Sequence, residues 1–421
     1  MSIILDPQQE ISVARSIDPS RRCAATTGPA GSGKTTIIRM VYEQLSDAGY
    51  DPVICAPTGK AAKRVQEATG KPAQTIHRLL EFTAPSDIDE RTGKPCGVTV
   101  PRRTRDRPIE SSVIICDEYA MVHRELHRDL VTSLPSGGRL LAFGDREQLS
   151  PIESHEQYKN EPTAFEMLLA KFNGVELTTV HRQTEGSGIL ANAQRVLKGT
   201  APKTMDDFVL HVTERPVDVV RNLLSKTDYT DLRNQIITPA NVSWIGTYKL
   251  NEVVQREVMP VTAEYFQLPR HKWDKHPVRL AVGDKVVMNK NHYNIVCSDG
   301  STGVFNGEVG RVLEINHDDE IIIDFEDRIA TVPAAIEVQG KYKKIIAYPQ
   351  ADLALAYVLT THKCQGSEYK VVTYVMNKSV TGMLNRRNLY TGITRAREHV
   401  NLVTDMRGLS LSLSTKEQRK W

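Results

Sequence analysis

The sequence predicts an α/β fold built on parallel sheets with smaller β-rich insertions, and three observations predict it. A glycine-rich phosphate-loop pattern, GPAGSGKT at Gly28–Thr35, lies between a β-prone stretch and a helical one. Several short apolar runs are bounded by turn residues, as buried parallel strands usually are. Between residues 280 and 328, short alternating runs separated by Gly, Asn and Asp are typical of a small antiparallel unit.

The length and composition set limits on the class of protein. A chain of 421 residues is too long for a single hydrophobic core, so we expect more than one domain. The net charge of +3 permits a nucleic-acid partner but does not require one. The six cysteines are scattered without a C-x-x-C pair, which argues against a zinc site and a disulfide framework. We see no secretory signal or membrane-spanning stretch, which predicts a soluble, cytoplasmic protein.

The surroundings of the phosphate loop support a nucleotide site. Residues 21–28 predict a short strand, and the apolar spacing in residues 34–49 predicts a helix. The backbone N–H groups of such a loop and the helix N-terminus hold phosphate oxygens. Lys34 is expected to reach the β- and γ-phosphates, and Thr35 is expected to bind Mg²⁺. The predicted nucleotide-binding residues of the loop are Gly28, Pro29, Ala30, Gly31, Ser32, Gly33, Lys34, Thr35 and Thr36.

Acidic and amide side chains follow two further predicted strands. Buried parallel strands are expected at residues 52–58, 112–118 and 139–145. An α/β sheet places its site at the carboxyl ends of such strands, where Asp117 and Glu118 lie. We expect Asp117 to bind Mg²⁺ and Glu118 to polarise an attacking water. Gln148 is suited to contacting a γ-phosphate or its water, although by chemistry alone this is a weak signal. An exposed acidic turn is the plain alternative for Asp117 and Glu118.

The set of motifs resembles superfamily 1 helicases, and within them the RecD-like branch (superfamily 1B) that includes the phage Dda type. The stretches that carry the resemblance cover nearly the whole chain: LDPQQ (5–9), GPAGSGKTT (28–36), APTGKAAKR (56–64), TIHRLL (75–80), DEYA (117–120), GDREQLSPI (144–152), LTTVHRQ (177–183), LTTHKCQGSEYKVV (359–372) and LYTGITRAREHV (389–400). Two positions depart from the family pattern. Tyr119 stands where a small residue is usual, and Cys364 stands where Ser is usual. Neither change removes a catalytic group.

The resemblance implies further roles at the nucleotide. Gln9 would contact the adenine and Glu368 the ribose. Arg182 and Arg395 would stabilise charge on the γ-phosphate during hydrolysis. Arg395 lies far along the chain, so it reaches ATP only if a second domain closes over the first. The implied cofactors are ATP and Mg²⁺, and the implied activity is 5′-to-3′ translocation on single-stranded DNA with duplex unwinding. The polarity rests on the resemblance alone.

The expected partners are single-stranded DNA and fork DNA. Backbone contacts of this kind are independent of sequence and come from hydroxyl, N–H and basic groups. The predicted DNA-binding residues are Thr58, Lys60, Thr75, His77, Thr361, His362 and Lys363. Tyr293 and Phe82 are nominated for base stacking. A motor that works as a monomer is expected, with no membrane association and with protein partners from replication, repair or recombination.

The resemblance also implies a domain arrangement. Residues 1–80 and 112–180 would form a first RecA-like motor domain, and residues 181–279 and 346–421 a second. The second is predicted to be another parallel α/β unit, with its first strand at residues 234–241, a later one at 370–376 and its last at 399–405. A pin-type β-hairpin insertion is expected at residues 81–111, where a basic arm follows the turn signal DERTGKP. A disordered basic loop is the alternative there. An SH3-like β-barrel insertion is expected at residues 280–345.

Two other classes of function are alternatives to the motor. A non-motor P-loop enzyme such as a nucleotide kinase has no use for DEYA, VHRQ, HKCQG and GITRAR together. An ATP-switched module that clamps or moves along single-stranded nucleic acid without unwinding it stays open, because hydrolysis and strand separation are separable activities.

Overall fold

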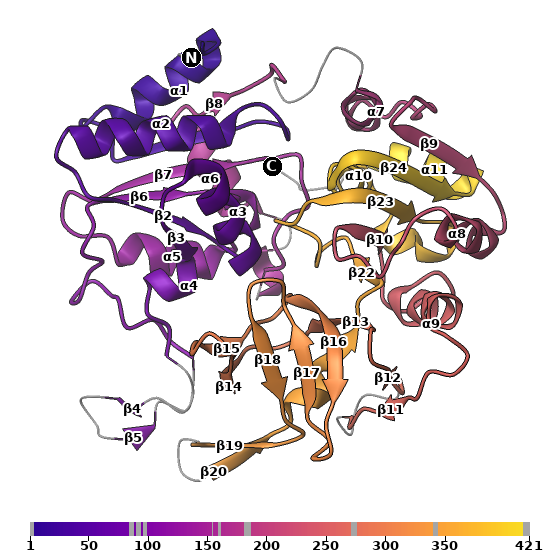
Figure 1. The fold of residues 1–421 in the computed structure, drawn as a ribbon. Helices are drawn as coiled ribbons and strands as arrows, with labels where there is room; N and C mark the ends of the chain where they lie inside the picture. The colour runs from indigo at the N-terminus through magenta and orange to yellow at the C-terminus, as the bar shows by residue number, and fades with distance from the viewer. Residues whose placement is uncertain are drawn as a thin grey trace. The chain divides into compact units, whose positions relative to one another are not determined.

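The computed structural model describes residues 4–83, 88–89, 94–95, 99–153, 155–158, 161–180, 187–270, 276–339 and 344–415 (Figure 1). The chain forms two compact units. Unit 1 comprises Met1–Thr83, Thr99–Ser187 and Lys416–Trp421, and unit 2 comprises Ala84–Val98 and Gly188–Thr415.

Unit 1 is built on a six-stranded sheet in the order β3-β2-β6-β7-β1-β8, in which every neighbouring pair is parallel. The strands are β1 (Cys23–Thr27), β2 (Pro52–Ala56), β3 (Ala73–Thr75), β6 (Val113–Cys116), β7 (Arg139–Gly144) and β8 (Val175–Glu176). The four strands predicted from apolar runs are β1, β2, β6 and β7, and all four lie inside the sheet. The edge strands β3 and β8 are short and partly exposed, so they carry no such run.

Helices cover both faces of this sheet (Figure 1). They are α1 (Pro7–Ile17), α2 (Lys34–Asp47), α3 (Gly59–Thr69), α4 (Ile76–Leu79), α5 (Arg124–Thr132) and α6 (Ala164–Lys171). Successive residues of a strand point to opposite faces. In β6, Val113 and Ile115 pack in the cluster that contains α1 and α2 side chains, whereas Ile114 and Cys116 pack in the cluster of α4, α5 and α6. The inner strands are therefore buried on both faces, which explains their unbroken apolar runs.

Unit 2 contains a second parallel sheet, in the order β22-β10-β23-β24-β9. Its strands are β9 (Phe208–Val212), β10 (Asn234–Thr238), β22 (Val358–Thr360), β23 (Tyr369–Val375) and β24 (Ala396–Thr404), and its helices are α7 (Gly188–Leu197), α8 (Pro216–Leu224), α9 (Thr247–Val258), α10 (Arg386–Ile393) and α11 (Met406–Ser414). The predicted strands at residues 234–241, 370–376 and 399–405 are confirmed. The expectation that β10 is the first strand is wrong, because β9 precedes it as a half-exposed edge strand.

The insertion in unit 2 is an antiparallel sheet in the order β18-β17-β16-β13-β21. Its strands are β13 (Lys285–Met288), β16 (Val309–Ile315), β17 (Ile321–Asp324), β18 (Ile329–Val332) and β21 (Leu353–Leu355), and two-stranded ladders join β11 (Phe266–Gln267) to β12 (Arg279–Leu280), β14 (His292–Val296) to β15 (Thr302–Val304), and β19 (Ile336–Gln339) to β20 (Lys344–Ala347). The expected small β-domain is present. Over the described residues its strand pairing does not close into a barrel, because β18 and β21 end the sheet without pairing to each other.

A hairpin lies in the predicted pin region. β4 (Ile88–Asp89) pairs antiparallel with β5 (Lys94–Pro95), at the two ends of the predicted DERTGKP turn. Residues 90–93 of that turn lie outside the described residues. The arm that follows is anchored at Arg103, whose guanidinium lies 2.6 Å from Glu81 Oε1 and 2.8 Å from Glu110 Oε1. Over its described part, from residue 99, the arm is therefore held by ion pairs to unit 1 and is no free basic loop.

A buried polar network fixes the antiparallel insertion to the parallel sheet of unit 2. Asp284, just before β13, accepts hydrogen bonds from the Tyr357 hydroxyl (2.7 Å) and from Gln255 Nε2 on α9 (2.6 Å). Burial raises the pKa of Asp284 above its usual range. The neighbouring Lys285 is fully buried and donates from Nζ to Asn234 O on β10 at 2.8 Å. These bonds join residues that are far apart in sequence, so they set where the insertion lies.

Among the residues that the model describes, no helix is long and apolar enough to cross a membrane.

Gly392 on α10, within the stretch LYTGITRAREHV, is a position at which the packing can be tested. A Cβ at this position would lie 2.0 Å from Cε2 of the buried Tyr374 ring. Gly392→Ala should therefore lower the free energy of unfolding by about 1–3 kcal/mol, the usual cost of overpacking. Urea denaturation measures this change. The control is Gly382→Ala, because a Cβ there meets no heavy atom within 4 Å. Equal unfolding midpoints for the two variants would contradict the expected strain.

Candidate nucleotide and nucleic-acid site

The phosphate loop joins the end of β1 to the start of α2. Gly31 and Gly33 adopt left-handed φ values of 82° and 83°, which glycine reaches without a Cβ penalty. Lys34 Nζ donates to Gly28 O at 2.7 Å and to Pro29 O at 2.9 Å, so the ammonium group lies over the loop. The whole predicted run Gly28–Thr36 is thus gathered at the N-terminus of α2, where the helix dipole favours anions.

Gln9 supports this loop. Its side chain is 4% exposed, its Oε1 accepts from Asp6 N (3.0 Å) in the capping box of α1, and its Nε2 donates to Ser32 O (3.0 Å). A Cβ at Gly33 would lie 2.3 Å from Gln9 Nε2, so the packing needs glycine there. Both ends of the amide are engaged inside unit 1, so Gln9 supports the loop. The NH₂ group carries a second N–H donor, and the predicted adenine contact stays a prediction.

Asp117 and Glu118 follow β6 directly and are both 4% exposed. Asp117 Oδ1 accepts from Glu118 N at 2.8 Å, and Glu118 has a left-handed φ of 51°, an uncommon conformation for a residue with a Cβ. Burial, followed by the neighbouring charge of Glu118, raises the pKa of Asp117 to about 6, while Arg64 and Lys34 act in the opposite direction. The loop cation and the acidic pair therefore share one electrostatic environment.

Two buried acceptor atoms in this region have unmet hydrogen-bonding capacity. Within the described residues, neither Glu118 Oε2 nor Gln148 Oε1 meets a donor. Glu118 Oε1 lies 3.4 Å from Arg64 Nη1, and Gln148 follows β7 with its backbone N bonded to Asp145 O. Leaving a buried acceptor unpaired costs about 1–3 kcal/mol, so these atoms are suited to receive a water or a ligand donor.

The residues predicted to hold Mg²⁺ fit such an ion by their chemistry. Thr35 lies in the first turn of α2 after the loop, and Asp117 follows β6. A hydroxyl and a carboxylate are hard oxygen ligands, and Mg²⁺ commonly takes one or two protein oxygens together with phosphate oxygens and waters. The raised pKa of Asp117 is also the perturbation that a bound cation would reverse.

Arg395 lies inside unit 2, at the end of α10. It is 2% exposed, donates from Nε to Thr391 O (3.0 Å) and from Nη1 to Ser367 O (3.3 Å), and no carboxylate in the described part of the chain pairs with it. The guanidinium is thus held by neutral acceptors and keeps its full charge. Arg182, the other predicted arginine, lies outside the described residues. Glu368, the predicted ribose contact, has its Oε2 bonded to Arg397 Nε at 2.7 Å.

The predicted DNA contacts in unit 1 lie after β2 and β3. Thr58 caps α3 by accepting from Ala61 N (3.2 Å), and Thr75 caps α4 by accepting from Arg78 N (3.1 Å). Each hydroxyl can still donate its own hydrogen. Lys60 lies in the first turn of α3. His77 is exposed, and its ring centroid lies 4.7 Å from that of Phe82, which itself packs on the core. Phe82 therefore supports His77 more readily than it would stack on a base.

In unit 2 the predicted DNA contacts differ in exposure. Thr361 is fully buried, with its hydroxyl 3.2 Å from the Tyr374 hydroxyl, so this side chain packs in the interior and its contact with DNA stays a prediction. The preceding Thr360 lines a pocket together with Lys363. Side chains alternate along a strand, and β22 ends at Thr360, so this alternation was the signal that could have separated the two threonines. His362 is half-buried beside them.

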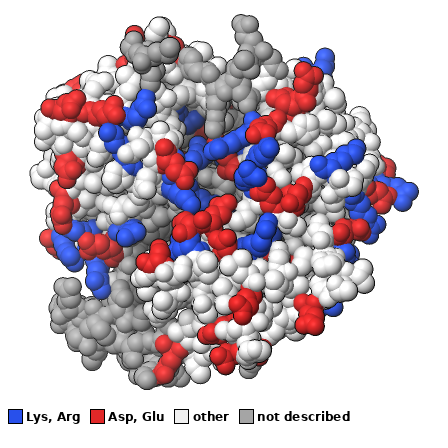
Figure 2. Space-filling model, in the orientation of Figure 1, with Lys and Arg blue, Asp and Glu red and all other residues white. Residues whose placement is uncertain are grey.

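Surface charge does not identify the nucleic-acid face by itself. On the face shown in Figure 2, lysines and arginines are interspersed with acidic side chains. This matches the small net charge of +3. Nucleic-acid binding is therefore inferred from individual motif residues.

Tyr119, the first departure from the family pattern, is a packing residue. It is fully buried, and its hydroxyl lies 2.8 Å from His127 Nδ1. A Cβ at Gly144 would lie 3.2 Å from Tyr119 N, so the end of β7 approaches this backbone closely. The large ring packs near the rings of His127 and Phe165, away from the carboxylates of Asp117 and Glu118.

Family models and known proteins match this chain in sequence. A family model described as an AAA domain matches residues 4–211, and one described as a UvrD-like helicase C-terminal domain matches residues 355–403. The ATP-dependent RecD2 DNA helicase of Deinococcus radiodurans is 30% identical over 390 residues, which make up 90% of this chain. The chain is a homologue of the RecD-like helicases. It spans 46% of the length of RecD2.

Other relatives agree with the RecD-like assignment. The ATP-dependent DNA helicase dda of phage T4 is 25% identical over 324 residues, which cover 72% of this chain and 66% of that protein. Two Pif1 helicase structures share the fold. One, described at forked double-stranded DNA, has a TM-score of 0.61 at 19% identity, covering 100% of this chain and 94% of that one. The other, Bacteroides Pif1 bound to single-stranded DNA, has a TM-score of 0.58 at 18% identity, covering 100% and 95%.

Gln9→Ala tests whether Gln9 supports the loop. The change removes the buried partners of Ser32 O and Asp6 N, so we expect a loss of about 1–3 kcal/mol in unfolding free energy without any nucleotide. Gln44→Ala, at an exposed position on α2, is the control and should change little. Normal stability of Gln9→Ala combined with weaker ATP binding would instead favour the adenine contact.

Proposed function

We propose that this chain is an ATP-dependent DNA helicase that moves 5′ to 3′ on single-stranded DNA and unwinds duplex. The observation that carries the proposal is the buried pair Asp117 and Glu118 in the electrostatic environment of Lys34, with unmet acceptors on Glu118 and Gln148. The names of the relatives RecD2 and dda, both ATP-dependent DNA helicases, support the same activity.

Different residues of unit 1 carry different roles in the proposed hydrolysis of ATP. The loop N–H groups and Lys34 hold the triphosphate, and Thr35 with Asp117 would hold Mg²⁺, which supplies charge neutralisation when bound. Glu118 Oε2 is the acceptor that orients the attacking water and receives its proton. Gln148 Oε1 accepts from the same water or from a donor near the γ-phosphate, without adding a negative charge.

Arg395 links hydrolysis to movement. Its buried charge is not neutralised by a carboxylate in the described residues, so it is available to the γ-phosphate in the transition state. Because Arg395 belongs to unit 2, the proposal requires unit 2 to close on the nucleotide and to open after hydrolysis. Arg182 is proposed as the second arginine. Glu368 would reach a ribose only after exchanging its ion pair with Arg397.

The DNA strand is proposed to run over both units. Its backbone would contact the hydroxyl, imidazole and ammonium groups of Thr58, Lys60, Thr75, His77, His362 and Lys363. The domain bounds drawn from the family, with motor domains at residues 1–80 with 112–180 and at residues 181–279 with 346–421, remain part of this proposal. A monomeric motor that works on fork DNA in replication, repair or recombination completes it.

The deciding experiment uses duplexes with a single-stranded tail. With ATP and Mg²⁺, we expect unwinding of the 5′-tailed duplex, little unwinding of the 3′-tailed one, and ATP turnover that rises with single-stranded DNA. Lys34→Ala should bind DNA but turn over no ATP, because the phosphates lose their ammonium contact. Turnover that ignores DNA would refute the motor. DNA-stimulated turnover without unwinding would instead identify a clamp or a bare translocase.

Arg395→Ala should lower kcat for ATP by about 10²–10³-fold while changing ATP affinity little. The reason is that a charge aimed at the transition state contributes to turnover more than to ground-state binding. Single-turnover hydrolysis and equilibrium binding of a fluorescent ATP analogue measure the two quantities. Arg407→Ala, at an exposed position on α11 of the same unit, is the matched control. A loss of affinity equal to the loss of kcat would show ground-state binding only.

A further inference from the structure

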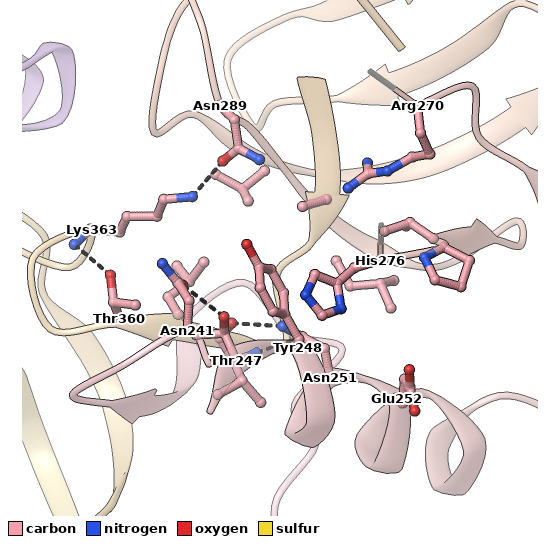
Figure 3. A pocket seen from close by; sticks show the side chains of 17 residues that line it. Asn241, Thr247, Tyr248, Asn251, Glu252, Arg270, His276, Asn289, Thr360 and Lys363 are labelled. Carbon is pink, nitrogen blue, oxygen red and sulfur yellow. Dashed lines mark hydrogen bonds between the residues drawn. The ribbon is translucent and has the colours of Figure 1, made fainter. Parts of the chain in front are cut away.

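Unit 2 contains a pocket that none of the roles above accounts for in full (Figure 3). It lies where α9 and the ends of β10 and β22 meet β13 and β21 of the antiparallel insertion. Its polar lining comes from segments far apart in the sequence: Asn241, Thr247, Tyr248, Asn251, Glu252, Arg270, His276, Asn289, Thr360 and Lys363. All of these belong to unit 2, so the pocket exists within one compact body.

An aromatic pair forms one wall of the pocket. The rings of Tyr248 and His276 are stacked, with centroids 4.2 Å apart and planes inclined by 29°. Tyr248 is 40% exposed although its ring is large and apolar. It projects from the first turn of α9 toward the middle of the pocket (Figure 3). A stacked, open ring pair is the kind of platform on which bases of single-stranded nucleic acid stack.

The polar groups of the pocket separate into two ends. At one end Lys363 donates to Asn289 Oδ1, and the Lys363 backbone N–H approaches the Thr360 hydroxyl. At the other end lie Arg270 and Glu252 (Figure 3). A phosphate is favoured beside the ammonium group of Lys363 and disfavoured beside the carboxylate of Glu252. The N–H and carbonyl groups of a base edge, in contrast, match a carboxylate and a guanidinium.

The size of the pocket limits what can enter. Its volume is about 120 Å³, whereas pockets for drug-sized ligands measure about 300–1,000 Å³. Part of the floor is apolar and comes from Val287, Leu355 and Val358. A single planar ring system fits this combination of size, apolar floor and aromatic wall, and a whole nucleotide does not.

We propose that this pocket receives one unpaired base of the bound DNA strand, which stacks on Tyr248 while its backbone phosphate lies beside Thr360 and Lys363. The inference rests on the proposed function, because it takes the DNA strand as the ligand. It adds a contact that holds the strand through a base rather than through its backbone. Base stacking of this kind tolerates any sequence, since every base has a π-face.

The test measures binding of oligothymidylate without ATP, with one abasic site moved along the strand. In the unchanged protein, one abasic position should weaken binding by about 5- to 150-fold, the range for the loss of one stacked base. Tyr248→Ala should weaken binding of the intact strand by a similar factor and should remove the penalty at that abasic position, because the two changes delete the same contact. Tyr248→Phe should keep both the affinity and the penalty.

A matched control excludes a general effect of losing an exposed tyrosine. Tyr348 is 48% exposed, belongs to unit 2 and does not line the pocket, so Tyr348→Ala should bind as the unchanged protein does. The proposal is overturned if Tyr248→Ala binds the intact strand normally, or if it keeps the full abasic penalty.

The same assay separates this proposal from the helicase proposal. It contains no ATP and reports binding alone, so it can fail while DNA-stimulated ATP turnover and unwinding are present, which would reject only the pocket. Absence of DNA-stimulated turnover, together with the predicted abasic penalty, would reject the motor and leave a DNA-binding pocket.

Discussion

The burial of both faces of the parallel sheet in unit 1 is the constraint on which the candidate active site depends. Its central strands β6, β7 and β1 pack mainly apolar side chains against helices on either side, and polar side chains within them, such as Thr26 and Arg139, are used in buried hydrogen bonds. The polar side chains that can meet a ligand lie where these strands end. The connections after β1, β6 and β7 leave the sheet at its carboxyl edge, and they carry Lys34, Asp117, Glu118 and Gln148. The site follows from the layered packing.

Charges that are buried with little compensation lie at the proposed functional positions of both units. In unit 1, Asp117 and Glu118 adjoin each other with only partial relief from Lys34 and Arg64. In unit 2, Arg395 is held by backbone carbonyls and by a threonine hydroxyl. Such arrangements lower stability relative to a paired or apolar alternative, and they are common where a charge must act on a ligand. Gln9 differs, because its amide is neutral and both of its ends are hydrogen-bonded within unit 1.

In unit 2 the antiparallel insertion contributes residues to the pocket as well as to the fold. Asp284 and Lys285 tie β13 to α9 and β10 through buried hydrogen bonds. This attachment brings Asn289 on the insertion against Lys363 on the segment after β22, and it closes the pocket around Tyr248. A surface that contacts DNA through a base would then be assembled from the motor fold and its insertion together.

The sequence alone determined the phosphate loop, its helix and the inner strands of both sheets, because these depend on local spacing: glycines at left-handed positions, apolar runs and helical periodicity. It also located Lys34, Asp117, Glu118 and Arg395 within motifs. Only the tertiary structure decided how Gln9 uses its amide, that Thr361 points inward, that β9 precedes β10 in the second sheet, and that Tyr248 and His276 stack. These features depend on pairings between segments tens to hundreds of residues apart, and local pattern carries no information about which distant atoms meet.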